Sequence, residues 1–355
     1  GRTQVNLTMG EDLTTLQELV VVGYGVQRKS DLTGSVGTVK SKDIERVPTS
    51  SIEQAMQGKV AGVYVTPASG QPGAGAVIRI RGTGTLNNSN PLFVVDGMLL
   101  DDASFINPQD VQSIEILKDA SATAIYGNRG ANGVVIITTK RGKAGEKAVI
   151  QFSSYYGTQA LTKKIPMANA AEYAQLYNEL PLPDVFANPA SLGAGTDWQD
   201  VIFRDAPIAN VQLSASGGSD KFLYNVSANY FDQTGILKDS RYDRLTFRVN
   251  NEYKLNPYVK LGNNLSFSNV NSQNPPGVIG SALRMPPVFG ERDSLGNFSD
   301  PTFFGTAIAN PAADLFYKDR NFSKGNRLVG TVYADITLFK HFTFRSNFGL
   351  DQAYI

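Results

Sequence analysis

The chain has 355 residues and a formal net charge of +1, from 33 Lys and Arg residues against 32 Asp and Glu residues. This balance provides no global positive field, so general binding to nucleic acid is disfavoured. Cysteine is absent and His341 is the single histidine, which excludes disulfides, thiolate metal sites and nearly every nucleophilic catalytic constellation, so we expect a non-enzyme with no metal and no cofactor.

The chain opens on an alternating stretch, Gly1 to Thr8, which predicts the last strand of a preceding unit and not a signal peptide. We therefore expect the sequence to begin inside a longer protein. No apolar run approaches the roughly 18 residues that a membrane-spanning helix requires, so a helical membrane protein is excluded, whereas a β-barrel is not.

A short apolar run follows, and it is typical of a β-strand. It comprises Leu19, Val20, Val21 and Val22, with Glu18 before it and Gly23, Tyr24 and Gly25 after it. An isolated strand leaves backbone N–H and C=O groups unpaired on both edges, so it needs another sheet to join. We predict a tether that a partner binds by strand addition. The alternative is an ordinary edge strand of a periplasmic domain.

The next segment has the pattern of a mixed α/β domain. Before residue 146 lie only five of the 19 Phe, 15 Tyr and one Trp residues, which indicates a change of environment at that point. Apolar runs predict strands over 77–81, 91–95, 114–117 and 133–139, and Ser51 caps a predicted short helix. Short helical turns are expected after Asn107-Pro108 and over 121–126.

From Ala148 onward, apolar and polar residues alternate, which predicts strands with one apolar face. In one of them Phe222, Tyr224, Val226, Ala228 and Tyr230 alternate with Asn225, Ser227 and Asn229. Seven such strands are expected, near 148–157, 211–216, 222–230, 245–250, 261–268, 331–338 and 342–348.

The polar faces of these strands decide what kind of sheet is predicted. They are mostly Asn, Ser, Thr, Gln and Arg, which suit a hydrated lumen, whereas the outer face of a soluble sandwich is usually rich in Lys and Glu. A membrane barrel is therefore favoured over a sandwich, with Val226 facing lipid and Ser227 facing a lumen where an arginine would be tolerated.

Connections between the predicted strands alternate between tight turns and long excursions, as in outer-membrane barrels. Residues 255–258 form a tight turn, whereas 165–205 and 273–325 are long. The first long segment has an amphipathic helical pattern at Ala171, Tyr173, Ala174, Leu176 and Tyr177. Because bacterial barrels have an even strand number, we predict an α/β domain followed by the antiparallel strands of a transmembrane β-barrel that continues beyond Ile355.

Several motifs together carry a family resemblance. The shorter ones are Glu18 to Gly25, Leu32 to Val36, Gln57 to Val63, Ile78 to Gly82 and Val94 to Gly97, and in the barrel half Thr196 to Trp198, Ser216 to Ser219, Asn229 to Phe231 and Gly235-Ile236. The most specific is Ile116 to Gly127, followed by Asn128 to Val134 and Thr138 to Gly142. With these motifs, nearly the whole chain resembles a SusC/RagA-type TonB-dependent outer-membrane transporter.

The resemblance implies a domain order. Residues 28–145 would be a plug domain, and residues 146–355 would be the first part of a barrel of about twenty-two strands. Residues 15–27 would be the TonB box and its linker, and residues 1–14 the tail of a periplasmic β-sandwich extension. The protein would lie in the outer membrane of a Gram-negative bacterium, with the plug and the N-terminus reachable from the periplasm.

The resemblance also implies partners and a mechanism. TonB, with ExbB and ExbD, would pull on the box and remodel the plug, and a SusD-like surface lipoprotein would close over the barrel as a lid. The two would capture a large nutrient, a glycan or an oligopeptide, between them, and outer-membrane lipid would surround the barrel. Energised import is thus the leading function. The alternatives are a receptor or adhesin anchored by the barrel, and a signal-transducing receptor.

Charged residues at predicted strand ends form a candidate latch between plug and barrel. Arg79 and Arg81 lie on one face of a predicted strand, and Lys118 and Asp119 end another. Buried ion pairs are costly unless fully partnered, so such charges suit a switch; the alternative is pairing within the plug surface. The family motifs add Gly82, Asp96, Gly97, Tyr126, Gly127, Arg129, Asn132 and Gly133 to this candidate set.

Other motifs have simpler interpretations. The glycines at 82–84 and 127–130 do not form a phosphate-binding pattern after a strand, so nucleotide binding is rejected. Residues 293–297 suit a hairpin turn better than a calcium loop, and Asp101-Asp102 suits a solvated loop better than a metal pair. His341, beside a turn, is interpreted as an interfacial side chain.

Overall fold

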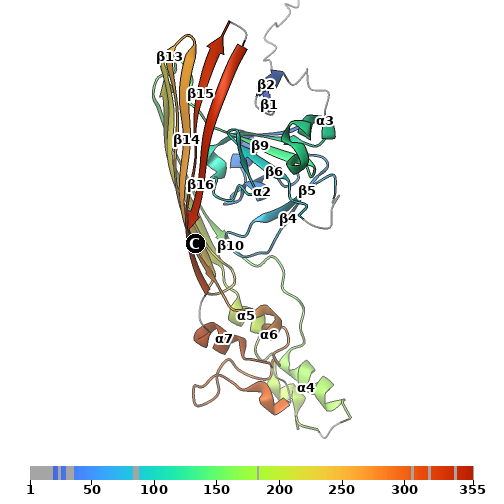
Figure 1. Ribbon diagram of the computed structural model, residues 1–355. Coiled ribbons are helices and arrows are strands. Elements are labelled where there is room, and N and C mark those ends of the chain that lie inside the picture. The colour runs from blue at the N-terminus through green and yellow to red at the C-terminus, as the bar shows by residue number, and fades with distance from the viewer. Residues whose placement is uncertain are drawn as a thin grey trace, which may run out of the picture.

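A computed structural model describes residues 19–22, 25–28, 36–82, 88–181, 184–304, 308–318, 321–339 and 342–354. Figure 1 shows a tall curved sheet, a compact α/β unit on its concave side, and a group of short helices at one end of the sheet. His341 lies outside the described residues, so its predicted interfacial position stays a prediction.

The tall sheet has seven antiparallel strands in sequence order, which confirms the predicted number: β10 (Val149–Gln159), β11 (Ala206–Gly218), β12 (Phe222–Thr234), β13 (Arg241–Asn256), β14 (Val259–Asn274), β15 (Asn321–Leu338) and β16 (Phe342–Tyr354). Tight turns join them at one end. In the turn after β13, the Asn256 side-chain oxygen accepts hydrogen bonds from the backbone N–H groups of Tyr258 (2.8 Å) and Val259 (2.9 Å). We refer to β10–β16 as the barrel sheet.

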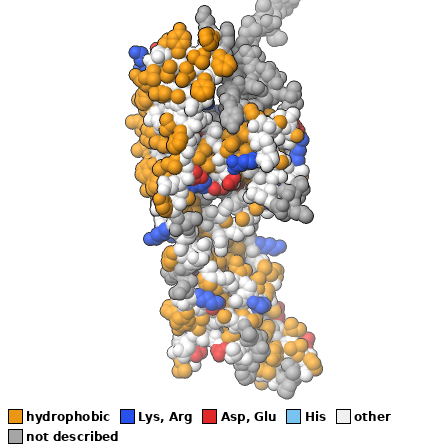
Figure 2. Space-filling view, in the orientation of Figure 1, with side chains coloured by type: hydrophobic (Ala, Val, Ile, Leu, Met, Phe, Trp, Pro, Cys, Tyr) orange, Lys and Arg blue, Asp and Glu red, His pale blue; other side chains and the backbone are white. Residues whose placement is uncertain are grey.

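The two faces of the barrel sheet differ as the alternation predicts. On β12, Val226 is 42% exposed and faces away from the α/β unit, whereas Ser227 is 3% exposed and faces it. Hydrophobic side chains cover the outer face, visible along the left edge of Figure 2. The predicted lipid-facing row is therefore confirmed as the outward row. The expectation that an arginine would be tolerated at Ser227 is wrong, because the α/β unit fills the space that a hydrated lumen would occupy.

The outward row yields a depth-dependent prediction. Replacing Val226 with arginine should destabilise the full-length barrel in lipid vesicles by about 2–4 kcal/mol, because a charged side chain at mid-membrane depth faces hydrocarbon. Arginine at Phe222, which also faces outward but lies at the first residue of β12, should cost only about 0–1 kcal/mol near the interface. Urea unfolding of the two variants measures the difference, and equal costs would contradict the assigned membrane depth.

The α/β unit is built on a five-stranded sheet of order β3-β8-β9-β6-β7, which we call the plug sheet. Its strands are β3 (Val36–Lys40), β6 (Leu92–Val95), β7 (Met98–Leu100), β8 (Val111–Leu117) and β9 (Val134–Thr139). β6 and β9 are parallel and the other pairs antiparallel. A second sheet pairs β4 (Val63–Pro67) with β5 (Ala76–Ile80).

Both faces of the plug sheet carry buried apolar residues, as expected for continuous apolar strands. One face packs Ile114, Ile116 and Ile137 against Ile44 and Ile52 of the helices α1 (Ser41–Glu45) and α2 (Ile52–Ala55). The other face packs with Tyr126, from the turns that follow α3 (Ala120–Thr123). A single-turn 3₁₀ helix at Pro108–Asp110 and two short 3₁₀ turns within Ala124–Gly130, separated by the non-helical Gly127, complete the unit. The predicted α/β domain is confirmed.

The long loops gather at the end of the barrel sheet that carries the helices in Figure 1. They contain α4 (Ala170–Asn178), α5 (Trp198–Ile202), α6 (Ile279–Ala282) and α7 (Pro311–Tyr317), with 3₁₀ turns at Pro189–Leu192 and Pro301–Phe304. They share a hydrophobic core of their own, formed by Trp198, Ile202, Val278, Ala282, Met285, Ala312 and Leu315. Within the described ranges, every helix is too short or too polar to cross a membrane.

Candidate functional site at the plug and barrel interface

A buried ion pair joins the plug sheet to the barrel sheet. β6 and β7 are linked by Asp96 and Gly97, both at positive φ (49° and 92°), which is the two-residue Asp-Gly hairpin turn. The turn directs the Asp96 carboxylate toward β9, where it accepts hydrogen bonds from the Thr139 N–H (3.1 Å) and hydroxyl (2.7 Å). Arg248 on β13 closes the site as the ionic partner of Asp96. The two charged side chains are only 2% and 4% exposed.

Further hydrogen bonds surround this pair. The Thr139 hydroxyl also accepts from Arg248 (3.0 Å) and from the Asn250 side-chain amide (2.9 Å), and that amide donates to the Lys140 carbonyl (2.8 Å). We refer to Asp96, Thr139, Arg248 and Asn250 as the buried latch. Just beyond it, a Cβ atom at Gly142 would overlap the backbone of Gly217 and Tyr224, so the exit segment of the plug passes in direct backbone contact with the barrel sheet.

A second polar contact lies beside the latch. The Gln212 side chain on β11 accepts from the Asn107 amide (2.7 Å) and donates to the Asp110 carboxylate (2.9 Å). Asp110 is 3% exposed. Burial raises the pKa of the Asp110 carboxyl, although the neighbouring Ser227 hydroxyl, the charges of Arg248 and Lys140 and the hydrogen bond from Gln212 act to lower it.

This carboxyl gives the plug a pH dependence. A raised native pKa means that stability is greatest with Asp110 protonated and falls as pH rises from about 4 toward the native pKa. Asp110→Asn cannot titrate, so we expect its plug to match the natural protein near pH 4 and to be the more stable of the two near pH 7. Proteolytic susceptibility of the plug in the full-length protein across this range measures the effect. Asp101→Asn, at a 92% exposed side chain, is the control, and identical pH profiles for natural protein and Asp110→Asn would contradict the prediction.

A third contact uses Arg327 on β15. It bridges Asp102 of the plug (2.7 Å) and Asp351 of β16 (2.8 Å), with its guanidinium carbon 4.6 Å from the centre of the Phe105 ring. Burial acts to raise the pKa of the Asp102 carboxyl, but hydrogen bonds from Ser104 and Arg327 hold that pKa below its usual value. Together the three contacts place plug carboxylates against barrel arginines and a glutamine.

The candidate latch from the sequence analysis is a different set of four charged residues, and their described contacts lie inside the plug. Arg81 pairs with Asp119, the Lys118 ammonium donates to the Ala61 carbonyl (3.2 Å), and Arg79 donates to the Asn90 side chain (3.0 Å). The expectation that Arg79 and Arg81 share one strand face is wrong, because β5 ends at Ile80 and Arg81 has a positive φ of 56°. Their assignment as a latch stays a prediction.

Most other residues of the candidate set hold plug loops together. Arg129 pairs with Asp101 (2.8 Å), and the Asn132 amide donates to the Asn88 carbonyl (2.9 Å). Gly133, at φ 91°, lies against the Ile80 side chain, where a Cβ atom would not fit without a shift. Gly82 and Gly127 also have positive φ, and Tyr126 is buried. Asp101 and Asp102 each face an arginine, and among the described residues no group of three or more acidic, His or Cys side chains could hold a metal ion.

The predicted tether is described only in part. β1 (Leu19–Val22) pairs antiparallel with β2 (Gly25–Arg28), with Val21 opposite Val26. This hairpin lies at the end of the molecule opposite the loop helices (Figure 1). Glu18, Gly23 and Tyr24 lie outside the described residues. One edge of β1 is thus occupied by β2, and its role as a partner-binding strand stays a prediction.

Sequence reasoning missed the buried latch as a unit. Arg248 and Asn250 fall in the strand predicted near 245–250 and Asp96 in a family motif, but the sequence pattern did not connect them. Two signals were available: an arginine within a row of small neutral polar residues, and an Asp-Gly pair that directly follows a buried apolar strand.

Comparison with known proteins gives a consistent picture. The profile of the TonB-dependent Receptor Plug Domain family matches residues 28–134. TonB-dependent receptor P26 of Formosa agariphila is 38% identical over 98% of this chain and 36% of its own length. TonB-dependent receptor SusC of Bacteroides thetaiotaomicron is 36% identical over 94% of this chain and 36% of its own length.

Solved structures agree with these relatives. The RagAB peptide importer in its open-open state superposes with a TM-score of 0.82, at 31% identity, over 95% of this chain and 42% of that chain. Its closed-closed state gives a TM-score of 0.79 at 30% identity. The chain spans little more than a third of the length of the curated relatives named here.

Proposed function

Because this chain belongs to the SusC/RagA-type TonB-dependent receptors, of which it carries the plug domain and the first barrel strands, we propose that the protein imports a large nutrient across the outer membrane with energy delivered through TonB. The observation that carries the proposal is the plug itself, seated by buried polar contacts against the inner face of a sheet whose outer face is apolar. Such a plug closes a pore and can be moved.

The buried latch is the closure device in this proposal. Its ion pair is almost fully removed from solvent, so breaking it leaves a costly unpaired charge, and remaking it restores the ion pair and the hydrogen bonds to Thr139. These properties favour two discrete plug positions over gradual loosening. The four plug charges Arg79, Arg81, Lys118 and Asp119 would serve to keep the plug intact while it moves.

The proposed partners follow the family. TonB, with ExbB and ExbD, would engage residues 18–24 by strand addition, for which β1 offers its second edge. A SusD-like lipoprotein would cover the loop helices from outside the cell. The cargo is a glycan or an oligopeptide, and the peptide importer among the similar structures supports the second.

Whole cells that express the full-length protein and its lipoprotein partner test the proposal. Accumulation of fluorescent peptide and glycan mixtures should depend on the protein and should stop when a proton uncoupler is added. The purified periplasmic domain of TonB should bind the full-length protein in detergent. Surface binding without uncoupler-sensitive accumulation would support the receptor or adhesin alternative instead.

A further inference from the structure

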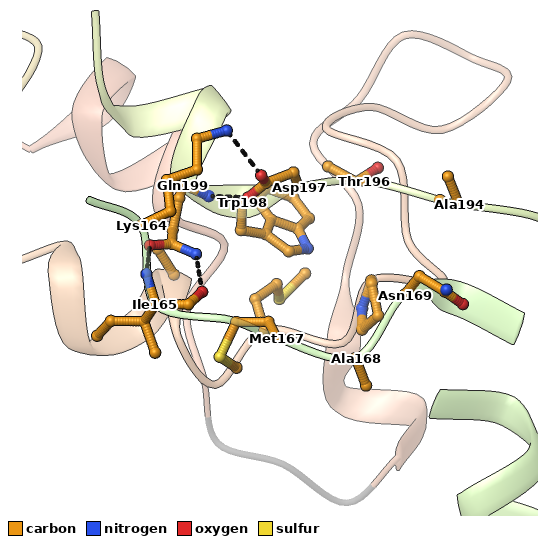
Figure 3. Close-up of a pocket in the computed structure, with 14 residues that line it drawn as sticks. Lys164, Ile165, Met167, Ala168, Asn169, Ala194, Thr196, Asp197, Trp198 and Gln199 are labelled. Carbon is orange, nitrogen blue, oxygen red and sulfur yellow. Dashed lines mark hydrogen bonds and ion pairs between the residues drawn. The ribbon is translucent and has the colours of Figure 1, made fainter. Parts of the chain in front are cut away.

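A cavity of about 270 Å³ lies between the first long loop, at residues 164–199, and the second, at residues 282–287. Figure 3 shows Trp198 and Gln199 on one side and the segment with Ile165, Met167, Ala168 and Asn169 on the other. Ala168 lines the cavity and is exposed, so the opening lies beside it. Met285 and Ala282 of the α6 region complete the apolar lining. The cavity is separate from the plug interface, because it belongs entirely to the loop cluster.

The walls of this cavity are fixed by contacts between the loops. The indole N–H of Trp198 donates to the Pro286 carbonyl (3.1 Å), and the Thr196 N–H donates to the Pro287 carbonyl (2.9 Å). The Gln199 side chain both accepts from the Ile165 N–H (2.9 Å) and donates to the Ile165 carbonyl (2.8 Å). Since these bonds tie the two loops together, a ligand would enter a preformed site.

The same bonds determine what chemistry the cavity can bind. They occupy the Trp198 N–H and both ends of the Gln199 amide, and the Asn169 oxygen accepts from the Glu172 N–H (2.9 Å). These bonds use part of the hydrogen-bonding capacity that a sugar would need; the Asn169 amide nitrogen, the Thr196 hydroxyl and the Asp197 carboxylate also line the cavity, but most of the lining is apolar. What the lining offers a ligand is thioether, aromatic and methyl surface, which favours an apolar side chain.

The rim adds a charge preference. Lys164 is held by Asp197 (2.9 Å) and Asp200 (2.5 Å), so the three side chains sum to one negative charge. A ligand with a positive charge next to its apolar group would complement this rim.

We propose that this loop cavity binds an apolar side chain of a peptide whose neighbouring residue is cationic. The inference rests on the proposed import function, because it assigns an oligopeptide as the cargo that the loops select. The volume of the cavity suits one bulky side chain with the adjoining backbone. The rest of the peptide would extend past the opening beside Ala168.

Calorimetry with the purified full-length protein and blocked tetrapeptides tests the proposal. Gly-Lys-Leu-Gly should bind at least about tenfold more tightly than Gly-Lys-Ser-Gly, because the serine peptide has no large apolar side chain to bury in the cavity. It should bind about threefold more tightly than Gly-Glu-Leu-Gly, because the rim pair is exposed and its field is weak. Maltotetraose should not compete. Equal affinities of the leucine and serine peptides, or competition by the sugar, would overturn the proposal.

Matched variants locate the binding. Ala168→Trp fills the opening from an exposed position and should weaken binding of the leucine peptide at least about tenfold, whereas Ala187→Trp, exposed on the same loop but outside the cavity, should not. Asp200→Asn should abolish the difference in affinity between Gly-Lys-Leu-Gly and Gly-Glu-Leu-Gly. It should preserve the difference in affinity between Gly-Lys-Leu-Gly and Gly-Lys-Ser-Gly. Unchanged binding by Ala168→Trp would overturn the assignment. Peptide binding that persists without uncoupler-sensitive uptake would instead contradict the import function alone.

Discussion

Replacing Val21 with proline is expected to abolish energised uptake while leaving the barrel folded and cargo binding intact. Proline removes the backbone N–H of that residue and does not fit within a paired strand, and strand addition depends on backbone hydrogen bonds. Deleting residues 15–25 should have the same effect. Cellular accumulation of labelled cargo, measured at equal surface abundance, should fall to the level seen with an uncoupler.

A side-chain substitution at the same site provides the control. Val21→Thr keeps the backbone donor and the preference for extended conformation, so uptake should persist. Because Val21 lies opposite Val26 in the β1–β2 hairpin, proline also weakens that pairing, and binding of the TonB periplasmic domain must be measured alongside uptake. Normal accumulation by Val21→Pro would show that the segment is not the energy-coupling strand.

Replacing Arg248 with alanine should release the plug. The substitution leaves the Asp96 carboxylate buried without its main ionic partner, which typically costs about 3–5 kcal/mol. We expect faster proteolysis of the plug in the purified full-length protein, and greater sensitivity of expressing cells to antibiotics that the closed barrel excludes. Arg129→Ala removes the exposed pair with Asp101 and should cost only about 0–1 kcal/mol, so it serves as the matched control.

The double variant separates the pair from its surroundings. With both Asp96→Ala and Arg248→Ala, no buried charge is left unpaired, so the plug should be more stable than with Arg248→Ala alone. Arg141, whose guanidinium lies 3.5 Å from the Asp96 carboxylate, limits the loss in the single variant. If the increase in antibiotic sensitivity of the double variant equals the sum of the increases in the two single variants, the latch acts through packing and not through charge.

Much of the fold could be predicted because alternation is a local property. Each barrel strand shows its own period of two, so the seven strands and the outward position of Val226 followed from short windows of sequence. Plug strands such as β9 were found from apolar runs between glycines. The error at Ser227 arose because the occupant of the barrel lumen is a distant part of the chain, which no local window contains.

The buried latch could not be predicted for the same reason. Asp96 and Arg248 are 152 residues apart, and their meeting depends on how one folded unit seats inside another. Arg81 shows a different, local error. The apolar pattern predicted a strand that included Arg81, but this residue has a positive φ, and the strand ends one residue earlier, at Ile80. The residue types at these sites could be read from the sequence, whereas their burial and their pairing could not.

The strand order of the plug sheet has a mechanical consequence. β3, the first plug strand after the β1–β2 hairpin, is an edge strand whose five residue pairs all join it to β8. Under the proposed function, tension from the N-terminal side would load this edge first, whereas the central strand β9 and the β6–β7 turn are held to the barrel sheet through Thr139 and Asp96. In that proposal the plug sheet would turn its weakest edge toward the pull, and the region anchored through Asp96 would serve as the base on which a displaced strand is rebuilt when the tension stops.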